Sequence, residues 1–72
     1  DKTMIKVHTP SSGRSELKMY DITGKLLLHK SLDCEPGWND FLIGKDDLNV
    51  KGMIYYEVEF SGNRAIKKML IL

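Results

Sequence analysis

A complete β-hairpin is encoded in the stretch LKMYDITGKLLL, residues 17–28. Asp21 can open a type I turn, because its carboxylate accepts hydrogen bonds from backbone N–H groups two residues further along the chain. Ile22 and Thr23 are compatible with the two central conformations of such a turn. Gly24 supplies the left-handed residue that completes a G1-bulge hairpin. The stretch therefore predicts two antiparallel strands joined by this turn.

Alternating apolar residues predict further strands on both sides of the hairpin, because alternate side chains of a strand point to one face. Leu26, Leu27 and Leu28 do not alternate, and Leu27 is the residue of this run that we expect to face inward. Leu17 and Met19 in residues 15–20 are also expected to face inward. In the other segments apolar residues share one face: Ile5 and Val7 in residues 3–8, Phe41 and Ile43 opposite Trp38 and Leu42 in residues 38–43, and Ile54, Tyr56, Val58 and Phe60 opposite Glu57 and Glu59 in residues 53–60.

Turn residues separate these segments. The sequence Cys34-Glu35-Pro36-Gly37 predicts a turn in which Pro presets φ and Gly accepts a positive φ. Ser61-Gly62-Asn63-Arg64 predicts a tight hairpin of the primed type, with Gly and Asn at its two central positions. Leu48, the one apolar residue of a polar connection, is expected to enter the core. Since all the connections are turns and no helical pattern occurs, we predict an all-β fold, a small antiparallel immunoglobulin-like β-sandwich of six or seven strands.

The length and charge of the chain limit what it can be. Its 72 residues suffice for a single domain over residues 1–72, which buries only about 60% of the surface that the unfolded chain exposes. The formal net charge of +1 gives no electrostatic reason to expect nucleic acid as a partner. No stretch approaches the ~20 apolar residues of a membrane-spanning helix, so we expect no membrane insertion. The single cysteine, Cys34, excludes an internal disulfide and favours a buried thiol over one that pairs outside the domain.

No motif predicts an enzyme, a metal site or a cofactor. His8 and His29 lie on separate expected strands, without a Ser, Cys or acid at a spacing that fixes a triad, and with Cys34 they lack zinc-ligand spacing. Asp46 and Asp47, with Asp40, could approach calcium through carboxylate oxygens. The connection lacks the alternating acidic pattern of an EF-hand, which favours a solvated acidic turn.

Two further segments allow a structural and a functional interpretation. Trp38 and Tyr55 could form an aromatic platform for sugar rings, although a lone Trp in a small domain is more often a core or edge residue. The terminal run Met69-Leu70-Ile71-Leu72 reads as a central strand buried on both faces, which is the interpretation that the sequence favours. The alternative is a terminal strand that a partner binds by main-chain pairing.

The order and spacing of three blocks resemble a known family. The hairpin block over residues 17–27, the middle block with Gly37, Leu48 and residues 52–58, and the final block Lys67-Lys68-Met69-Leu70-Ile71-Leu72 are together similar to the type A C-terminal sorting domain of the bacterial type IX secretion system. The similarity covers residues 16–72. It implies that the chain is the C-terminal domain of a longer secreted protein.

The resemblance also implies a function without catalysis. Such a domain acts as an address label: the parent crosses the inner membrane into the periplasm, and the outer-membrane secretion translocon then recognises the domain. A sortase-like peptidase commonly removes it, and the cargo reaches the cell surface or is released. On this basis we expect partner recognition by Asp21, Gly24, Lys25, Lys67, Lys68, Met69, Leu70, Ile71 and Leu72. The rival hypothesis is an immunoglobulin-like accessory module that binds carbohydrate or spaces a catalytic domain.

Overall fold

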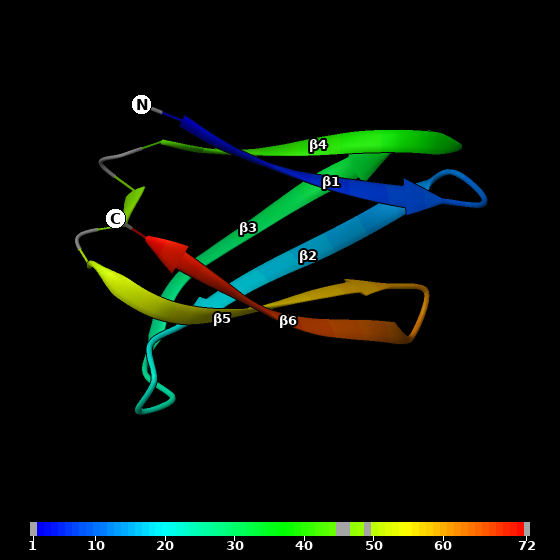
Figure 1. Ribbon diagram of the computed structural model, residues 1–72. Coiled ribbons are helices and arrows are strands. Elements are labelled where there is room, and N and C mark those ends of the chain that lie inside the picture. Colours follow the sequence, from blue (N-terminus) through cyan, green and yellow to red (C-terminus); the bar gives the residue numbers. More distant parts are fainter. Residues whose placement is uncertain (1, 45–46, 49, 72) are drawn as a thin grey trace.

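The computed structural model describes residues 2–44, 47–48 and 50–71, which form six strands (Figure 1). The strands are β1 (Lys2–Thr9), β2 (Gly13–Tyr20), β3 (Leu26–Cys34), β4 (Gly37–Gly44), β5 (Gly52–Phe60) and β6 (Asn63–Ile71). None of the described residues belongs to a helix long and apolar enough to cross a membrane.

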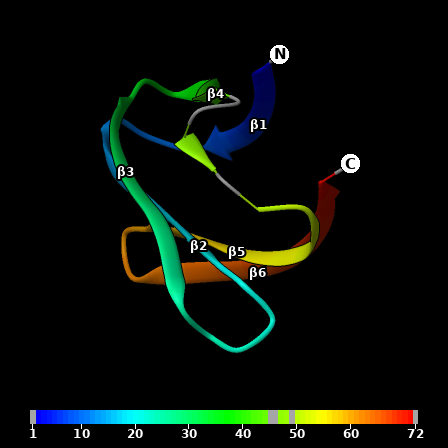
Figure 2. The same ribbon diagram turned by 90° about the vertical axis from the view of Figure 1, so that its left-hand side faces the viewer.

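The strands form two antiparallel sheets of unequal size. One sheet has four strands in the order β3-β2-β5-β6, and the other contains only β1 and β4. Viewed from the side in Figure 2, the two-stranded sheet lies above the larger sheet, with β4 beside the upper end of β3. The expected all-β class and the small antiparallel sandwich are confirmed, with six strands.

The core lies between the sheets and is built by strict alternation. On β2 the inner side chains Ser15, Leu17 and Met19 are all 0% exposed, while the residues between them are partly exposed. The hydroxyl of Ser15 donates to the carbonyl oxygen of Glu59 at 2.9 Å, which satisfies the buried polar group. The other buried apolar residues are Ile5, Cys34, Phe41, Ile43 and Ile54, and Leu48 packs against them as expected. The predicted inner face of β2 is therefore confirmed, and the residues predicted to share one face on β1, β4 and β5 lie together on the core side.

The β2–β3 hairpin has the predicted turn and one feature that was not predicted. The backbone N–H of Gly24 donates to the carbonyl of Asp21 at 3.0 Å, and Gly24 has a φ of 89°. The pairing then shifts by one residue, so that Tyr20 is opposite Leu26 but Met19 is opposite Leu28. This bulge leaves Leu27 without a partner, and both Leu27 and Leu28 pack against the core. The bulge explains why the three leucines do not alternate.

Two other turns refine the expectations. Gly37 has a φ of 104°, as its predicted place in a Pro-Gly turn requires. The β5–β6 turn, however, is centred one residue earlier than predicted. Phe60 pairs with Asn63, so the two central residues are Ser61 and Gly62, both with positive φ. Positive φ at both positions is the pattern of a type I′ turn, whose twist suits a hairpin.

A buried polar corner joins the end of β1 to the connection between β3 and β4. The Thr9 side chain, 1% exposed, donates to the carbonyl of Glu35 at 3.0 Å. The Asn39 amide oxygen accepts from the Glu35 N–H at 3.0 Å, and its NH₂ group donates to the Glu35 carbonyl at 2.9 Å. These bonds fix the place where the chain leaves one sheet for the other.

A matched pair of isoleucines on neighbouring strands tests this core. Ile54 on β5 is 1% exposed and Ile66 on β6 is 68% exposed. Replacement of Ile54 by Ala should lower the free energy of unfolding by about 2–5 kcal/mol, because it leaves a cavity. Replacement of Ile66 by Ala should change it by less than about 0.5 kcal/mol. Urea unfolding followed by circular dichroism measures both, and equal losses would contradict the assigned core.

Candidate functional site

Strand β6 is an open edge of the four-stranded sheet. It pairs with β5 only, and no described residue pairs with its other side. The expectation of a central strand buried on both faces is therefore wrong for the described part of this run. The sequence could not show this, because strand order depends on pairing with segments far away in the chain.

The predicted recognition run 67–72 divides between the two faces of the sheet. Lys68 and Leu70 point outward with Ile66, and Leu70 is 58% exposed. Met69 and Ile71 point inward and pack against the core. Lys67 is on the inner face too, but is exposed. Leu72 lies outside the described residues.

The register places the other predicted recognition segment, the turn at residues 21–25, at the same end of the sheet. Tyr20, just before this turn, pairs with Tyr55, and Tyr55 pairs with Lys68. Two strand spacings, roughly 10 Å, separate β2 from β6. Figure 1 shows the turn and the end of β6 on the same side of the molecule.

Apolar side chains occupy the outer face of the sheet at this end. We call them the sheet-end patch: Leu26, Met53, Tyr55 and Leu70, all of them exposed. Leu26 is opposite Tyr20 and Met53 is opposite Leu70, so the patch has residues on three strands, β3, β5 and β6, with Tyr20 of β2 between Leu26 and Tyr55. Sequence reasoning missed Leu26 and Met53 as surface residues of a site, since only the bulge and the strand order bring them together.

Within the turn, Asp21 and Gly24 shape the backbone while Lys25 is exposed. One carboxylate oxygen of Asp21 accepts from the Thr23 hydroxyl at 2.6 Å, the Thr23 N–H at 2.9 Å and the Lys25 N–H at 3.0 Å. The Thr23 hydroxyl and then the Lys25 N–H hold the pKa of Asp21 below its ordinary value of 3.8. Ile22, at the tip, is also exposed. A partner at this turn would therefore meet Ile22 and Lys25 rather than the Asp21 carboxylate.

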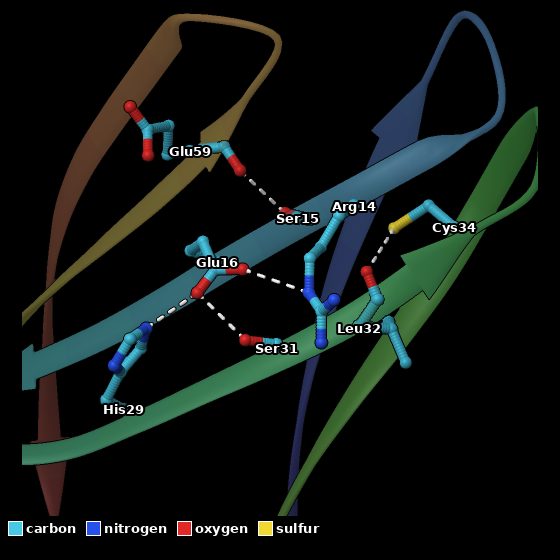
Figure 3. A network of polar contacts seen from close by, with 8 residues as sticks. All are labelled: Arg14, Ser15, Glu16, His29, Ser31, Leu32, Cys34 and Glu59. Carbon is cyan, nitrogen blue, oxygen red and sulfur yellow. Dashed lines mark hydrogen bonds and ion pairs between the residues drawn. The ribbon is translucent and has the colours of Figure 1, made fainter.

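A second polar cluster lies on the outer face of β2 and β3 (Figure 3). One oxygen of Glu16 bonds the His29 ring nitrogen Nε2 at 2.7 Å and the Ser31 hydroxyl at 2.8 Å. Its other oxygen is 3.4 Å from Nε of Arg14. The Ser31 hydroxyl, followed by His29, lowers the pKa of Glu16. Here a serine, a histidine and an acid do meet, which the sequence did not reveal.

The geometry of this cluster differs from that of a nucleophilic triad. In a triad the serine bonds the histidine, and the acid orients the histidine from its other side. Here Ser31 and His29 both bond one oxygen of Glu16. The Ser31 hydroxyl therefore donates its hydrogen bond to the carboxylate and not to the imidazole. The arrangement is that of a cross-strand polar network that joins β2 to β3.

The two aromatic residues considered for a sugar platform lie on opposite sides of the molecule. Trp38 is on the outer face of the two-stranded sheet, 71% exposed, and its ring meets that of His8 edge to face at 5.1 Å. Tyr55 is on the outer face of the other sheet. A platform built from both is therefore not formed, although Trp38 alone presents an open aromatic surface.

Two of the aspartates considered for a calcium site, Asp40 and Asp47, have structural partners. Asp47 accepts from the Gly44 N–H at 2.7 Å and from the Lys30 ammonium at 3.2 Å, and these two contacts lower its pKa. Asp40 pairs with Lys6 on the outer face, and Asp46 lies outside the described residues. Across the described ranges, no three His, Cys, Asp or Glu residues are arranged to hold a metal ion.

Cys34 is buried, and burial followed by the nearby Asp33 raises the pKa of its thiol. A buried thiol with a raised pKa is a poor nucleophile. This favours the interpretation of Cys34 as a buried thiol over that of a thiol that pairs outside the domain.

Comparisons with known proteins give no further guide, since no family model, no curated protein and no solved structure matches the chain.

The hydrogen bonds of Asp21 predict a pH-dependent effect on stability. A carboxyl with a lowered pKa contributes stability above its ordinary, unfolded-state value of 3.8, and this contribution is lost as the pH falls through the lower pKa of the folded state. Asp21→Asn should therefore reduce the urea midpoint at pH 7, and the deficit should shrink toward about pH 2.5.

Asp33→Asn serves as the control, because Asp33 is exposed on β3 and makes no side-chain hydrogen bond to the described residues. It should leave the midpoint nearly unchanged at pH 7. A deficit for Asp21→Asn that stays the same at both pH values would show that its charge plays no part in the turn.

Proposed function

We propose that this chain is a C-terminal sorting domain, recognised by the type IX secretion machinery for export of its parent protein across the outer membrane. The observation that carries the proposal is the position of β6: the strand formed by the final block of the resemblance is an unpaired edge with exposed apolar and basic side chains. A partner can bind such a strand through its main chain.

The charges of β6 oppose binding to a second copy. An antiparallel pairing of two β6 strands about their midpoint places Lys67 opposite Lys67 on one face, and Lys68 opposite Ile66 on the other. Like charges directly opposite each other destabilise a strand pair, and lysine on an edge strand is a common protection against self-association. The same lysines favour a partner strand or surface that carries carboxylates. We therefore infer an acidic recognition surface on the translocon.

The sheet-end patch gives this partner a second point of contact. A partner strand along β6 would lie beside Leu70, and an apolar extension of the partner across the outer face would cover Met53 and Tyr55. Such an extension would end near the turn and the exposed Lys25. In this proposal the sortase-like peptidase acts later, on a domain already exported, and the parent passes from the periplasm to the cell surface or the medium.

Export of a reporter tests the proposal. A fluorescent protein with an N-terminal signal peptide and residues 1–72 at its C-terminus is expressed in a Bacteroidetes strain with a working type IX system. Lys67→Glu with Lys68→Glu should leave most of the reporter in the periplasm, because the charge that matches the partner is reversed. The measurement is fluorescence in the medium and at the cell surface relative to the periplasm.

The control is Lys6→Glu with Lys18→Glu, which changes the net charge equally on two strands, β1 and β2, that do not pair with β6. Circular dichroism of each purified domain checks that both variants fold. Equal export of both folded variants would overturn the role of β6. Retention of the unaltered fusion in the periplasm would overturn the sorting function itself.

The exposed ring of Trp38 favours one second candidate, the accessory module that binds carbohydrate. A sugar ring can stack on an open indole face. Under this alternative, Trp38→Ala should abolish retention of the domain on an insoluble polysaccharide while it leaves export intact. The sorting proposal expects no retention in either form.

A further inference from the structure

The unequal sheets leave a groove of about 260 Å³ along β1. Its lining comes from three strands: Ile5, Lys6, Val7 and His8 of β1, Tyr56 and Val58 of β5, and Ala65 and Lys67 of β6. The groove is smaller than the roughly 300–1,000 Å³ of pockets that enclose a small ligand. A narrow ligand such as an extended peptide therefore fits it better than a compact small molecule.

The kind of lining identifies one wall as a backbone edge. The four β1 residues are consecutive, so residues of both faces of that strand border the groove, as they do along a strand edge. β1 pairs with β4 on one side, and no described residue pairs with its other side. On β5 and β6, by contrast, only alternate residues line the groove, all of them on the inner face. The groove thus has an open strand edge as one wall and the inner face of β5 and β6 as its floor.

The chemistry of this floor is apolar with one positive charge. Tyr56 and Val58 are only half-buried, and Ala65 is exposed although it lies on the inner face of β6. Lys67 makes no ion pair with a carboxylate of the described residues. The groove lining contains no acidic residue, and the neighbouring Lys6 is paired with Asp40 on the outer face.

We propose that the groove is a docking site for an extended peptide of a partner protein, which adds to β1 as the third strand of the two-stranded sheet. Alternate apolar side chains of this peptide face Tyr56 and Val58, and a carboxylate on the same face pairs with Lys67. Main-chain hydrogen bonds to β1 supply affinity, while the charge at Lys67 selects the register. This site adjoins β6 and shares Lys67 with it, but the peptide pairs with the open edge of β1 rather than with that of β6, and the site does not depend on the sorting function.

Titration with a designed peptide, followed by ¹H–¹⁵N NMR of the domain, tests the proposal. The probe is acetyl-TVTETVT-amide, whose two valines and glutamate share one face of a strand. We expect shifts of the amide signals of residues 5–8 together with those of Ala65 and Lys67. A version with N-methyl groups on alternate residues cannot donate to β1 and should not bind.

Two neighbouring lysines give a matched control for the charge. Lys67→Glu should weaken binding of the glutamate peptide about threefold to fivefold and favour acetyl-TVTKTVT-amide instead, as expected for a partly exposed ion pair. Lys68→Glu adds the same charge on the opposite face and should leave the affinity nearly unchanged. Equal effects of the two substitutions would overturn the ion pair with Lys67.

Three results would overturn the docking site. One is the absence of shifts at millimolar peptide, and another is a set of shifts confined to β6 with β1 unmoved. The third is a shift of the β1 signals with protein concentration alone, which would assign the groove to a second copy of the chain.

Discussion

Strand β2 has neighbours on both of its edges, and its inner side chains are completely buried, so the pleat of this one strand fixes which face of the larger sheet is the core. The pairing of β2 with β3 is local, because a short turn joins the two strands. The pairing of β2 with β5 is not, because β3 and β4 lie between these strands in the sequence. The two-stranded sheet is large enough to cover only part of the face that β2 defines. The half-buried residues of β5 and β6 follow from this mismatch, as does the groove beside β1.

Local chemistry was sufficient to predict much of the fold. Asp21 and Gly24 specify their turn by a carboxylate that accepts nearby N–H bonds and by a residue without a Cβ, and neither depends on the rest of the chain. Alternation likewise indicated which residues of β1, β2, β4 and β5 share a face. Alternation failed for Leu26, Leu27 and Leu28. A bulge adds one residue to the strand there, and no local signal in the sequence marks its position.

The candidate sites were less predictable, for a reason that particular residues illustrate. Lys67 and Lys68 are adjacent in the sequence but belong to opposite faces, and their exposure depends on β6 being an edge, which strand order alone decides. Lys30 is a second residue whose contacts the sequence alone did not predict. It occupies an inner-face position on β3, and its ammonium reaches the Leu42 carbonyl at 2.9 Å and Asp47 at 3.2 Å, so it closes the open side of the sandwich between β3 and β4. Neither arrangement follows from composition or periodicity.

The pairing of β1 with β4 also bears on how the chain reaches this structure. Its partners are far apart in the sequence, from Thr9 with Gly37 to Lys2 with Gly44. Closing such long loops is entropically costly and slows folding, whereas the β2–β3 and β5–β6 hairpins form from near neighbours. We therefore expect the two hairpins to form early, and the two pairings between distant segments, β1 with β4 and β2 with β5, to form later. During that interval the edges of β1 and β2 lack these partners, and the newly made chain is then most susceptible to capture by chaperones or to aggregation.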